Sequence, residues 1–590
     1  MVVVVGFNYM KTKKNRTDNR FVPKAIVALD YNQIYGEEEL NLTIADHLAD
    51  VPTLVVLHHI LMLHWPLHYV MNSPMFHRKA IGRLNQALKG KAKRNLIQLL
   101  RPELRRKLQK NKPDYILIDT QSTLHVCYEA LRNYMPMEGY DDNDINATEE
   151  ELQDIYKAYL KANSYWTGKQ CISSDIIDTM LAIEVPFIEF KHPKPVLSSA
   201  YKALKFFEYC ESHPPYDAYL KQMLTDIGLD DWHQYISLIV SIIPDIIKSP
   251  YVKFDEKDQW AYNFFAQYAV DIEDFKKQKE WDGNESIKYL RDNFVIRISP
   301  NMLMFLSPDL IVDKLYQALK FTMWKTISNH NLLTPSGKPY NDFSHFTSQL
   351  GTDFSEKYLA NAILTKIFAN QADALYNDEQ VKQAKITSPS DFYILKGENL
   401  AVVEYKDLII SDSVKHSGDI NLIKKTIIER ICLDTEILDK KGKVKRKQKG
   451  VGQILDSISR LMGNEYDKLD SRLKNVKKIF PIVVTTDITF SALGINLLII
   501  KETECLIRRY ADILKDKEIF IFTPIIIDLN NLIDYAFLFN TGKADFFQSL
   551  EDYIRINDGN LQSFDVYVKD RLLPIRNSKE EVQFLIQPNL

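Results

Sequence analysis

The feature that most constrains the fold is a hairpin pattern in Ser390–Asp407, SDFYILKGENLAVVEYKD. Two largely apolar runs flank the turn-forming sequence KGEN, which predicts two antiparallel strands joined by a tight turn. Side chains two residues apart in a strand point to the same face, so Glu404 and Lys406 project together while Tyr405 points away. The turn folds the first strand back and can bring Asp391 near Glu404. The pattern therefore predicts two carboxylates and a lysine at one end of a hairpin.

These charged residues close a strand that is otherwise apolar, and charges in such a place need a partner or a ligand. Two carboxylates, from Asp391 and Glu404, suit a hard cation, because Mg²⁺ takes one or two carboxylates together with waters and phosphate oxygens. The backbone carbonyl of Tyr405 is a further candidate ligand. A bound Mg²⁺ or Mn²⁺ can polarise a phosphodiester and activate water. Lys406 can then orient that water or stabilise developing negative charge.

The same residues resemble the PD-(D/E)XK nuclease superfamily, which includes the restriction endonucleases. Its signature is an Asp followed, after a gap, by (D/E)-X-K on the next strand. Asp391 takes the first position here, and Glu404 and Lys406 take the second motif as E-Y-K. Ser390 stands where the family has Pro, while Pro389 lies one residue further back. The resemblance implies a magnesium-dependent endonuclease that hydrolyses phosphodiester bonds.

The resemblance covers about residues 345–540 and extends to the flanking elements. It implies a metal-site role for Glu356, on the helix before the Asp strand. It implies a catalytic role for Gln453, on the helix after the E-X-K strand. An apolar strand is then expected, and Ile479–Thr486, IFPIVVTT, fits that expectation.

The chain has 590 residues, which predicts at least two domains. Residues 1–340 show apolar residues at three- and four-residue spacing, as in Trp232–Ile247, and are predicted to be mostly helical. Prolines and turn formers near Leu333 place the boundary there. In residues 345–590 helix and strand signals alternate, with a helix expected over Ser355–Tyr376 and a strand over Ile519–Leu529. The predicted fold is α+β overall: a large helical region, then an α/β restriction-endonuclease-like domain with a small mixed sheet flanked by helices.

Residues 408–450 form a long insertion between the E-X-K strand and the helix of Gln453, and we expect this insertion to have its own structure. Its last part, Asp439–Gly450, is strongly basic. A basic loop there could follow a phosphate backbone, or it could be a solvated hairpin tip. The candidate nucleic-acid-binding residues are Lys440, Lys441, Lys443, Lys445, Arg446, Lys447 and Lys449.

Composition bears on the nucleic-acid surface, the cellular compartment and membrane association of the protein. The net charge is −3, so a nucleic-acid surface must be local rather than global. Five scattered cysteines without a CxxC pair are typical of a reducing cytosol, and we expect a cytoplasmic protein. The apolar stretch Val51–Val70 contains four histidines and two prolines, which disfavours a membrane span. We expect a buried helix there, with a break near Pro66.

Two alternatives to the nuclease interpretation stay open at this point. Glu404 and Lys406 could form a surface ion pair on an edge strand. The chain could also have a nuclease-like fold without catalytic activity and act as a nucleic-acid-binding or scaffolding protein. DNA is favoured over RNA as the partner. The N-terminal region could be a sensor, a substrate clamp, or the surface for a protein partner or a homo-oligomer. By analogy at the level of the fold, such proteins resemble effectors of anti-phage defence.

Overall fold

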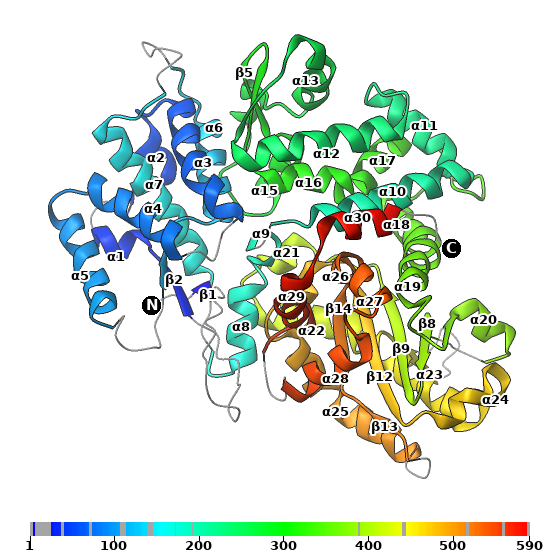
Figure 1. The fold of residues 1–590 in the computed structure, drawn as a ribbon. Helices are drawn as coiled ribbons and strands as arrows, with labels where there is room; N and C mark the ends of the chain where they lie inside the picture. Colours follow the sequence, from blue (N-terminus) through cyan, green and yellow to red (C-terminus); the bar gives the residue numbers. More distant parts are fainter. Residues whose placement is uncertain are drawn as a thin grey trace.

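The computed structural model describes residues 4–5, 25–36, 41–69, 74–106, 114–137, 145–170, 173–191, 193–386, 390–438, 444–514, 518–556 and 561–586. The described chain is mainly helical, with small sheets, which confirms the expected α+β class. Figure 1 shows a helical group at the left, a second helical group above, and a sheet covered by helices at the lower right.

The first helical group surrounds a three-stranded sheet in the order β1–β2–β3. Its strands are β1 (Val4–Val5), β2 (Ala25–Ala28) and β3 (Asp114–Ile116), and its longer helices include α3 (Thr53–Tyr69), α4 (Pro74–Ala87), α5 (Gly90–Arg106), α6 (Thr120–Arg132) and α7 (Glu149–Gly168). The expected break at Pro66 is wrong, because α3 continues through it to Tyr69. A proline inside a helix costs about 3 kcal/mol, but Leu61, Leu63 and Trp65 are buried around it and hold the helix in place.

The second helical group carries a small antiparallel sheet in the order β4–β6–β5. Its main elements are α10 (Val196–Ser212), α12 (Trp232–Lys248), α16 (Pro308–Leu315), α17 (Gln317–Asn329), β4 (Tyr251–Lys253), β5 (Val295–Ser299) and β6 (Met302–Phe305). The helices follow the apolar spacing of the sequence, since Tyr235, Leu238, Ile239, Ile242 and Ile246 form one buried face of α12.

The main sheet has the order β13–β12–β9–β8–β7, and β14 also pairs with β12. Its strands are β7 (Ala374–Asn377), β8 (Phe392–Lys396), β9 (Asn399–Lys406), β12 (Lys478–Thr485), β13 (Phe520–Ile521) and β14 (Ile525–Asp528). β8 pairs antiparallel with both β7 and β9. β12 pairs in parallel with β9, β13 and β14. The sheet is therefore mixed, with β9 in its interior.

Two expected elements of this region differ from the structure. The helix expected up to Tyr376 ends at Phe368, and Tyr376 lies instead in β7, where it pairs with β8. The strand expected over Ile519–Leu529 is divided into β13 and β14. Pro524 lies between them and has no N–H to donate to a neighbouring strand, so the ladder with β12 is interrupted there.

The hydrophobic core crosses the expected domain boundary. One face of the main sheet, including Val403 and Phe480, belongs to the same buried cluster as the N-terminal helices. The other face, including Val402, packs with the helices that follow it and with Ile177 and Leu181 from α8 (Ile176–Glu184). The division into residues 1–340 and 345–590 stays a prediction, but its two parts share both layers of the core.

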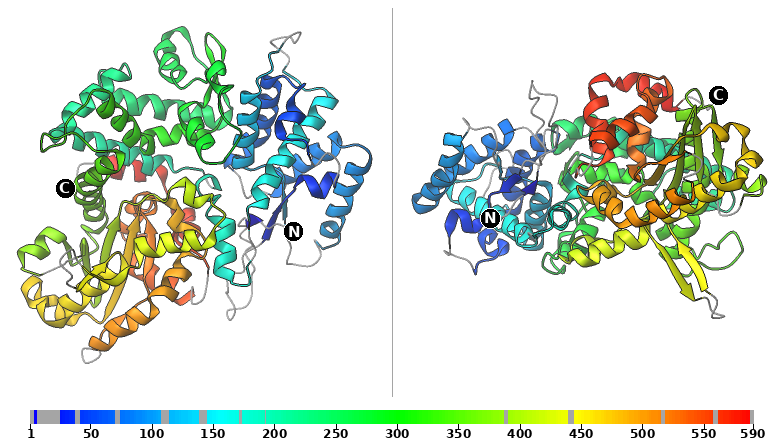
Figure 2. Two further views of the ribbon diagram at one scale, coloured as in Figure 1. Left: turned by 180° about the vertical axis from the view of Figure 1, so that it is seen from behind. Right: turned by 90° about the horizontal axis from the view of Figure 1, so that it is seen from below.

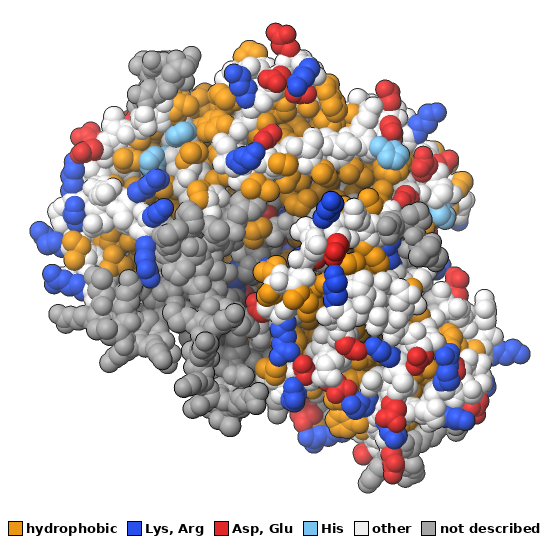
Figure 3. Space-filling model, in the orientation of Figure 1, with side chains coloured by type: hydrophobic (Ala, Val, Ile, Leu, Met, Phe, Trp, Pro, Cys, Tyr) orange, Lys and Arg blue, Asp and Glu red, His pale blue; other side chains and the backbone are white. Residues whose placement is uncertain are grey.

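The described helices include none that is long and apolar enough to cross a membrane. On the face shown in Figure 3, Lys and Arg side chains are interspersed with Asp and Glu side chains. At the lower right of this face, among the described residues, neither sign of charge predominates.

Candidate active site

The strand register places Asp391 and Glu404 side by side. Phe392 of β8 pairs with Val403 of β9 in the antiparallel hairpin, so the next pair outward is Asp391 with Glu404. The backbone N–H of Tyr405 donates to Asp391 Oδ2 at 2.7 Å. Directly opposed residues on one face of such a pair have Cβ atoms about 5 Å apart. The hairpin and the meeting of the two acids are therefore as the sequence predicts.

Glu404 and Lys406 form an ion pair, but a buried one. Lys406 Nζ donates to Glu404 Oε1 at 2.5 Å, and the Glu404 side chain is 2% exposed. The alternative of a surface pair on an edge strand is wrong, because β9 has β8 on one side and β12 on the other. The second carboxylate oxygen, Oε2 of Glu404, is buried and has no hydrogen-bond partner among the described residues.

Glu356 reaches this cluster from a π-helical segment, η2 (Gly351–Ala360), between α18 (Phe343–Leu350) and α19 (Asn361–Phe368). Burial raises the pKa of Glu356, while Lys406 and a hydrogen bond with Asp391 oppose that rise. Extra backbone width in π-helical turns is frequent at functional sites. The expected proximity of Glu356 to the two acids is thus present.

The cluster holds more negative than positive charge. Burial raises the pKa of Asp391 well above its ordinary value, and the nearby carboxyl groups of Glu404 and Glu356 raise it further. Burial also raises the pKa of Glu404 against the opposing effect of Lys406. Burial alone would lower the pKa of Lys406, but Glu404 and Asp391 outweigh it and the pKa ends above its ordinary value. Lys406 thus interacts with all three acids, and Lys382 acts from further out on Glu356 and Asp391.

The oxygen atoms of this cluster are the donors to consider for a divalent cation. Within the described residues, no group of three or more His, Cys, Asp and Glu side chains is placed so that it could hold a metal ion. Mg²⁺ needs fewer protein ligands, since it keeps several waters and also uses substrate phosphates. The unpartnered Oε2 of Glu404 and the adjacent Asp391 are oxygen donors of the required kind. The role of the Tyr405 carbonyl as a ligand stays a prediction.

Asp407 anchors this end of β9, and sequence reasoning missed it. Lys320 Nζ of α17 donates to Asp407 Oδ2 at 2.8 Å. The Ser355 hydroxyl donates to the same oxygen at 2.6 Å, and the Thr486 hydroxyl donates to Oδ1 at 2.7 Å. Ser355 precedes Glu356, so Asp407 fixes both the strand that carries Lys406 and the helix that carries Glu356. These partners are distant in sequence, so no local signal reveals them.

The side-chain carbonyl group of Gln453 accepts a hydrogen bond that caps its own helix. Gln453 is in the first turn of α23 (Val451–Arg460), and the N–H of Gly450 donates to its Oε1 at 3.0 Å. One helical turn later, the hydroxyl of Ser457 is 3.0 Å from that of Ser390, next to Asp391. The helix face that includes Gln453 therefore lies against the start of β8. The catalytic role of Gln453 stays a prediction. Its observed role is to cap the start of α23.

The insertion 408–450 has its own structure, as expected. It contains α21 (Asp412–Lys415), α22 (Ile420–Ile431) and the antiparallel hairpin of β10 (Asp434–Leu438) and β11 (Val444–Gln448). The hairpin projects from the body of the molecule as a yellow ribbon in the right-hand view of Figure 2.

The base of this hairpin lies near the cluster. Burial lowers the pKa of Lys449, and the positive charges of Arg430, Lys447 and Lys406 lower it further, which places Lys449 within electrostatic reach of Lys406. Of the other candidates, Lys440, Lys441 and Lys443 lie outside the described residues. Lys445 and Arg446 are described only as backbone in β11.

Comparison with protein-family models, with curated proteins and with solved structures found no match for this chain.

Proposed function

We propose that this protein is a metal-dependent nuclease of the PD-(D/E)XK type that hydrolyses phosphodiester bonds, with DNA as its substrate. The observation that carries the proposal is the buried cluster on an interior strand, where Asp391 and Glu404 lie side by side and one oxygen of Glu404 has no partner within the described chain. A buried carboxylate oxygen without a hydrogen-bond partner is costly, and a cation ligand is the simplest reason to keep this one.

In this proposal Asp391 and Glu404 hold Mg²⁺ or Mn²⁺, with the Tyr405 carbonyl as a third oxygen. When bound, the cation supplies a Lewis acid for the phosphate and a more acidic water. Lys406 orients the attacking water or stabilises the charge that develops on the phosphate. Its raised pKa keeps it protonated at neutral pH, which favours the second of these roles. Glu356 and Gln453 support the site from the two flanking helices.

The hairpin β10–β11 supplies the surface for the substrate backbone. Its basic residues extend from Lys449, near the cluster, along β11 and away from the body of the protein. Lysine and arginine contacts to phosphate give affinity without sequence specificity. Contacts of this kind would hold the substrate whatever its sequence. A role in anti-phage defence stays a prediction.

The direct test is incubation of plasmid DNA and of single-stranded RNA with the protein and Mg²⁺ or Mn²⁺, comparing wild type with Glu404→Gln and Lys406→Ala. We expect metal-dependent DNA cleavage and a loss of about 100-fold or more in each variant, the usual effect of removing a group that stabilises the transition state. The matched control is Lys396→Ala at the other end of the same hairpin, where the lysine forms an outer ion pair with Asp545.

Cleavage that survives both Glu404→Gln and Lys406→Ala would overturn the assignment of the site. Cleavage of RNA alone would change the substrate class and leave the site intact. Binding of DNA without any cleavage in Mg²⁺ or Mn²⁺ would favour the non-catalytic alternative.

A further inference from the structure

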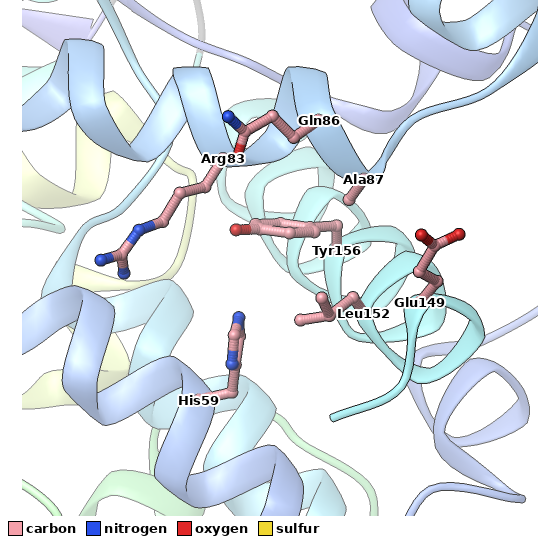
Figure 4. Close-up of a pocket in the computed structure, with 7 residues that line it drawn as sticks. All are labelled: His59, Arg83, Gln86, Ala87, Glu149, Leu152 and Tyr156. Carbon is pink, nitrogen blue, oxygen red and sulfur yellow. The ribbon is translucent and has the colours of Figure 1, made fainter. Parts of the chain in front are cut away.

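A small cavity lies in the N-terminal helical group, separate from the acidic cluster. It has a volume of about 280 Å³ and is lined from three helices. This volume is at the small end of ligand pockets, which span roughly 300 to 1,000 Å³. Figure 4 shows its lining residues: His59 from α3; Arg83, Gln86 and Ala87 from α4; and Glu149, Leu152 and Tyr156 from α7.

Tyr156 gives this cavity an unused hydrogen-bonding group. The residue is 2% exposed, and its hydroxyl has no hydrogen-bond partner in the described part of the chain. In Figure 4 the hydroxyl points into the space between Arg83 and His59. The ring of His59 meets that of Tyr156 edge-on, with centroids 6.2 Å apart. A buried hydroxyl without a partner costs free energy, and a ligand in the cavity would remove that cost.

The charged residues that line the cavity are Arg83 and Glu149. Arg83 forms no ion pair among the described residues, although it acts electrostatically on both His59 and Tyr156. The carboxylate at the rim, Glu149, is already paired with Lys89 at 3.0 Å. Burial lowers the pKa of His59 to about 4, with further lowering by His58 and Arg83, so its imidazole is neutral at pH 7. Arg83 is thus the charge left for a ligand.

We propose that this cavity binds a small organic anion whose phosphate or carboxylate group contacts Arg83 and the hydroxyl of Tyr156. The guanidinium group suits planar, bidentate recognition of such oxyanions. The apolar part of the ligand lies against Leu152 and Ala87, and the amide of Gln86 adds a polar contact at the edge. The site gives the N-terminal region a ligand-binding function that does not depend on the nuclease proposal.

The test is calorimetric titration of the full-length protein with four probes: phenyl phosphate, benzoate, inorganic phosphate and phenol. We expect phenyl phosphate or benzoate to bind with a dissociation constant below about 1 mM, more tightly than inorganic phosphate, and phenol not to bind. Arg83→Gln should weaken binding by about tenfold or more, and Tyr156→Phe by about threefold or more, as expected when hydrogen bonds to a charged group are removed. The ratio of the two aryl anions tells a phosphate site from a carboxylate site.

The control variant is Arg78→Gln, an exposed arginine on the same helix that does not line the cavity. It should leave every dissociation constant unchanged. A second readout is the histidine NMR signal, because an anion beside His59 should raise its pKa from about 4. Thermal unfolding checks that each variant is folded. Equal binding by wild type and Arg83→Gln, or no binding of either aryl anion to wild type, would overturn the proposal.

Discussion

At the scale of single residues, the candidate active site is a local excess of buried negative charge. Asp391, Glu404 and Glu356 lie around the ammonium group of Lys406, and an oxygen of Glu404 has no hydrogen-bond partner in the described chain. Such an arrangement is unfavourable for the fold by itself, because desolvated carboxylates are costly. Functional sites commonly keep groups that cost stability. This cost in folding free energy is therefore an argument that the site binds a ligand of opposite charge.

The first prediction is that Asp391→Asn stabilises the protein at pH 8 in EDTA. The pKa of Asp391 is raised in the folded state, so its contribution to stability is present at low pH and is lost as pH rises through that raised value. Asparagine cannot ionise, and it can still accept the hydrogen bond from Tyr405 N–H. We expect a gain in the free energy of unfolding on the order of 1 kcal/mol, the usual size of the effect of a single substitution.

Chemical denaturation at pH 8 and at pH 4 measures this effect, which should shrink at the lower pH. Asp467→Asn, at an exposed acid, is the control and should change little. Adding Mg²⁺ or Mn²⁺ should stabilise wild type more than Asp391→Asn, because the cation binds only the folded site. A variant less stable than wild type at pH 8 in EDTA would contradict this account of the charge.

At the scale of elements, two features distant in sequence add to the site that the β8–β9 hairpin forms. The π-helical segment η2 brings Glu356 beside Asp391, and Asp407 ties that segment and β9 to Lys320. The hairpin β10–β11 then extends a basic strand from the same end of the sheet. We expect changes in this basic hairpin to alter the affinity for DNA more than the rate of phosphodiester hydrolysis.

The second prediction concerns that basic strand. Replacing Lys447 and Lys449 together by alanine should weaken binding of non-specific duplex DNA and reduce the slope of log affinity against log salt by about 2, roughly 0.9 for each phosphate that is no longer neutralised. Fluorescence anisotropy at several salt concentrations measures the slope. The matched control replaces Lys276 and Lys277, two lysines on the N-terminal side that pair with Glu273 and Asp274. An unchanged slope in the Lys447/Lys449 variant would remove the hairpin from the substrate surface.

At the scale of the whole molecule, the N-terminal helices and the sheet domain are joined by partly buried ion pairs as well as by the core. Glu189 pairs with Arg291 at 2.5 Å and with Lys415 at 3.3 Å, and Arg291 is 3.5 Å from Asp412. Lys320 and Asp407 form a further pair at 2.8 Å. Breaking a buried pair is strongly destabilising, because the remaining charge is left without compensation.

The third prediction is that the two parts unfold together. Because one buried cluster runs from the N-terminal helices to the main sheet, separating residues 1–340 from 345–590 would expose a large apolar surface on each. We expect a single calorimetric transition for the full chain and poor solubility of each fragment when expressed alone. Co-expression of the two fragments is the control and should restore a soluble complex. Two well-separated transitions, or a stably folded fragment 345–590, would contradict this prediction.

The sequence by itself determined the hairpin of β8 and β9 and the meeting of Asp391, Glu404 and Lys406, because strand alternation and a tight turn act over a few residues. It also determined helices such as α12, whose apolar spacing is local. Tertiary structure alone decided that β9 is an interior strand, that α3 continues through Pro66, and that Pro524 divides the last strand. It also brought Ser355, Lys320 and Thr486 to Asp407, and Arg83 to Tyr156. Those outcomes depend on packing between segments distant in the chain, which no local pattern records.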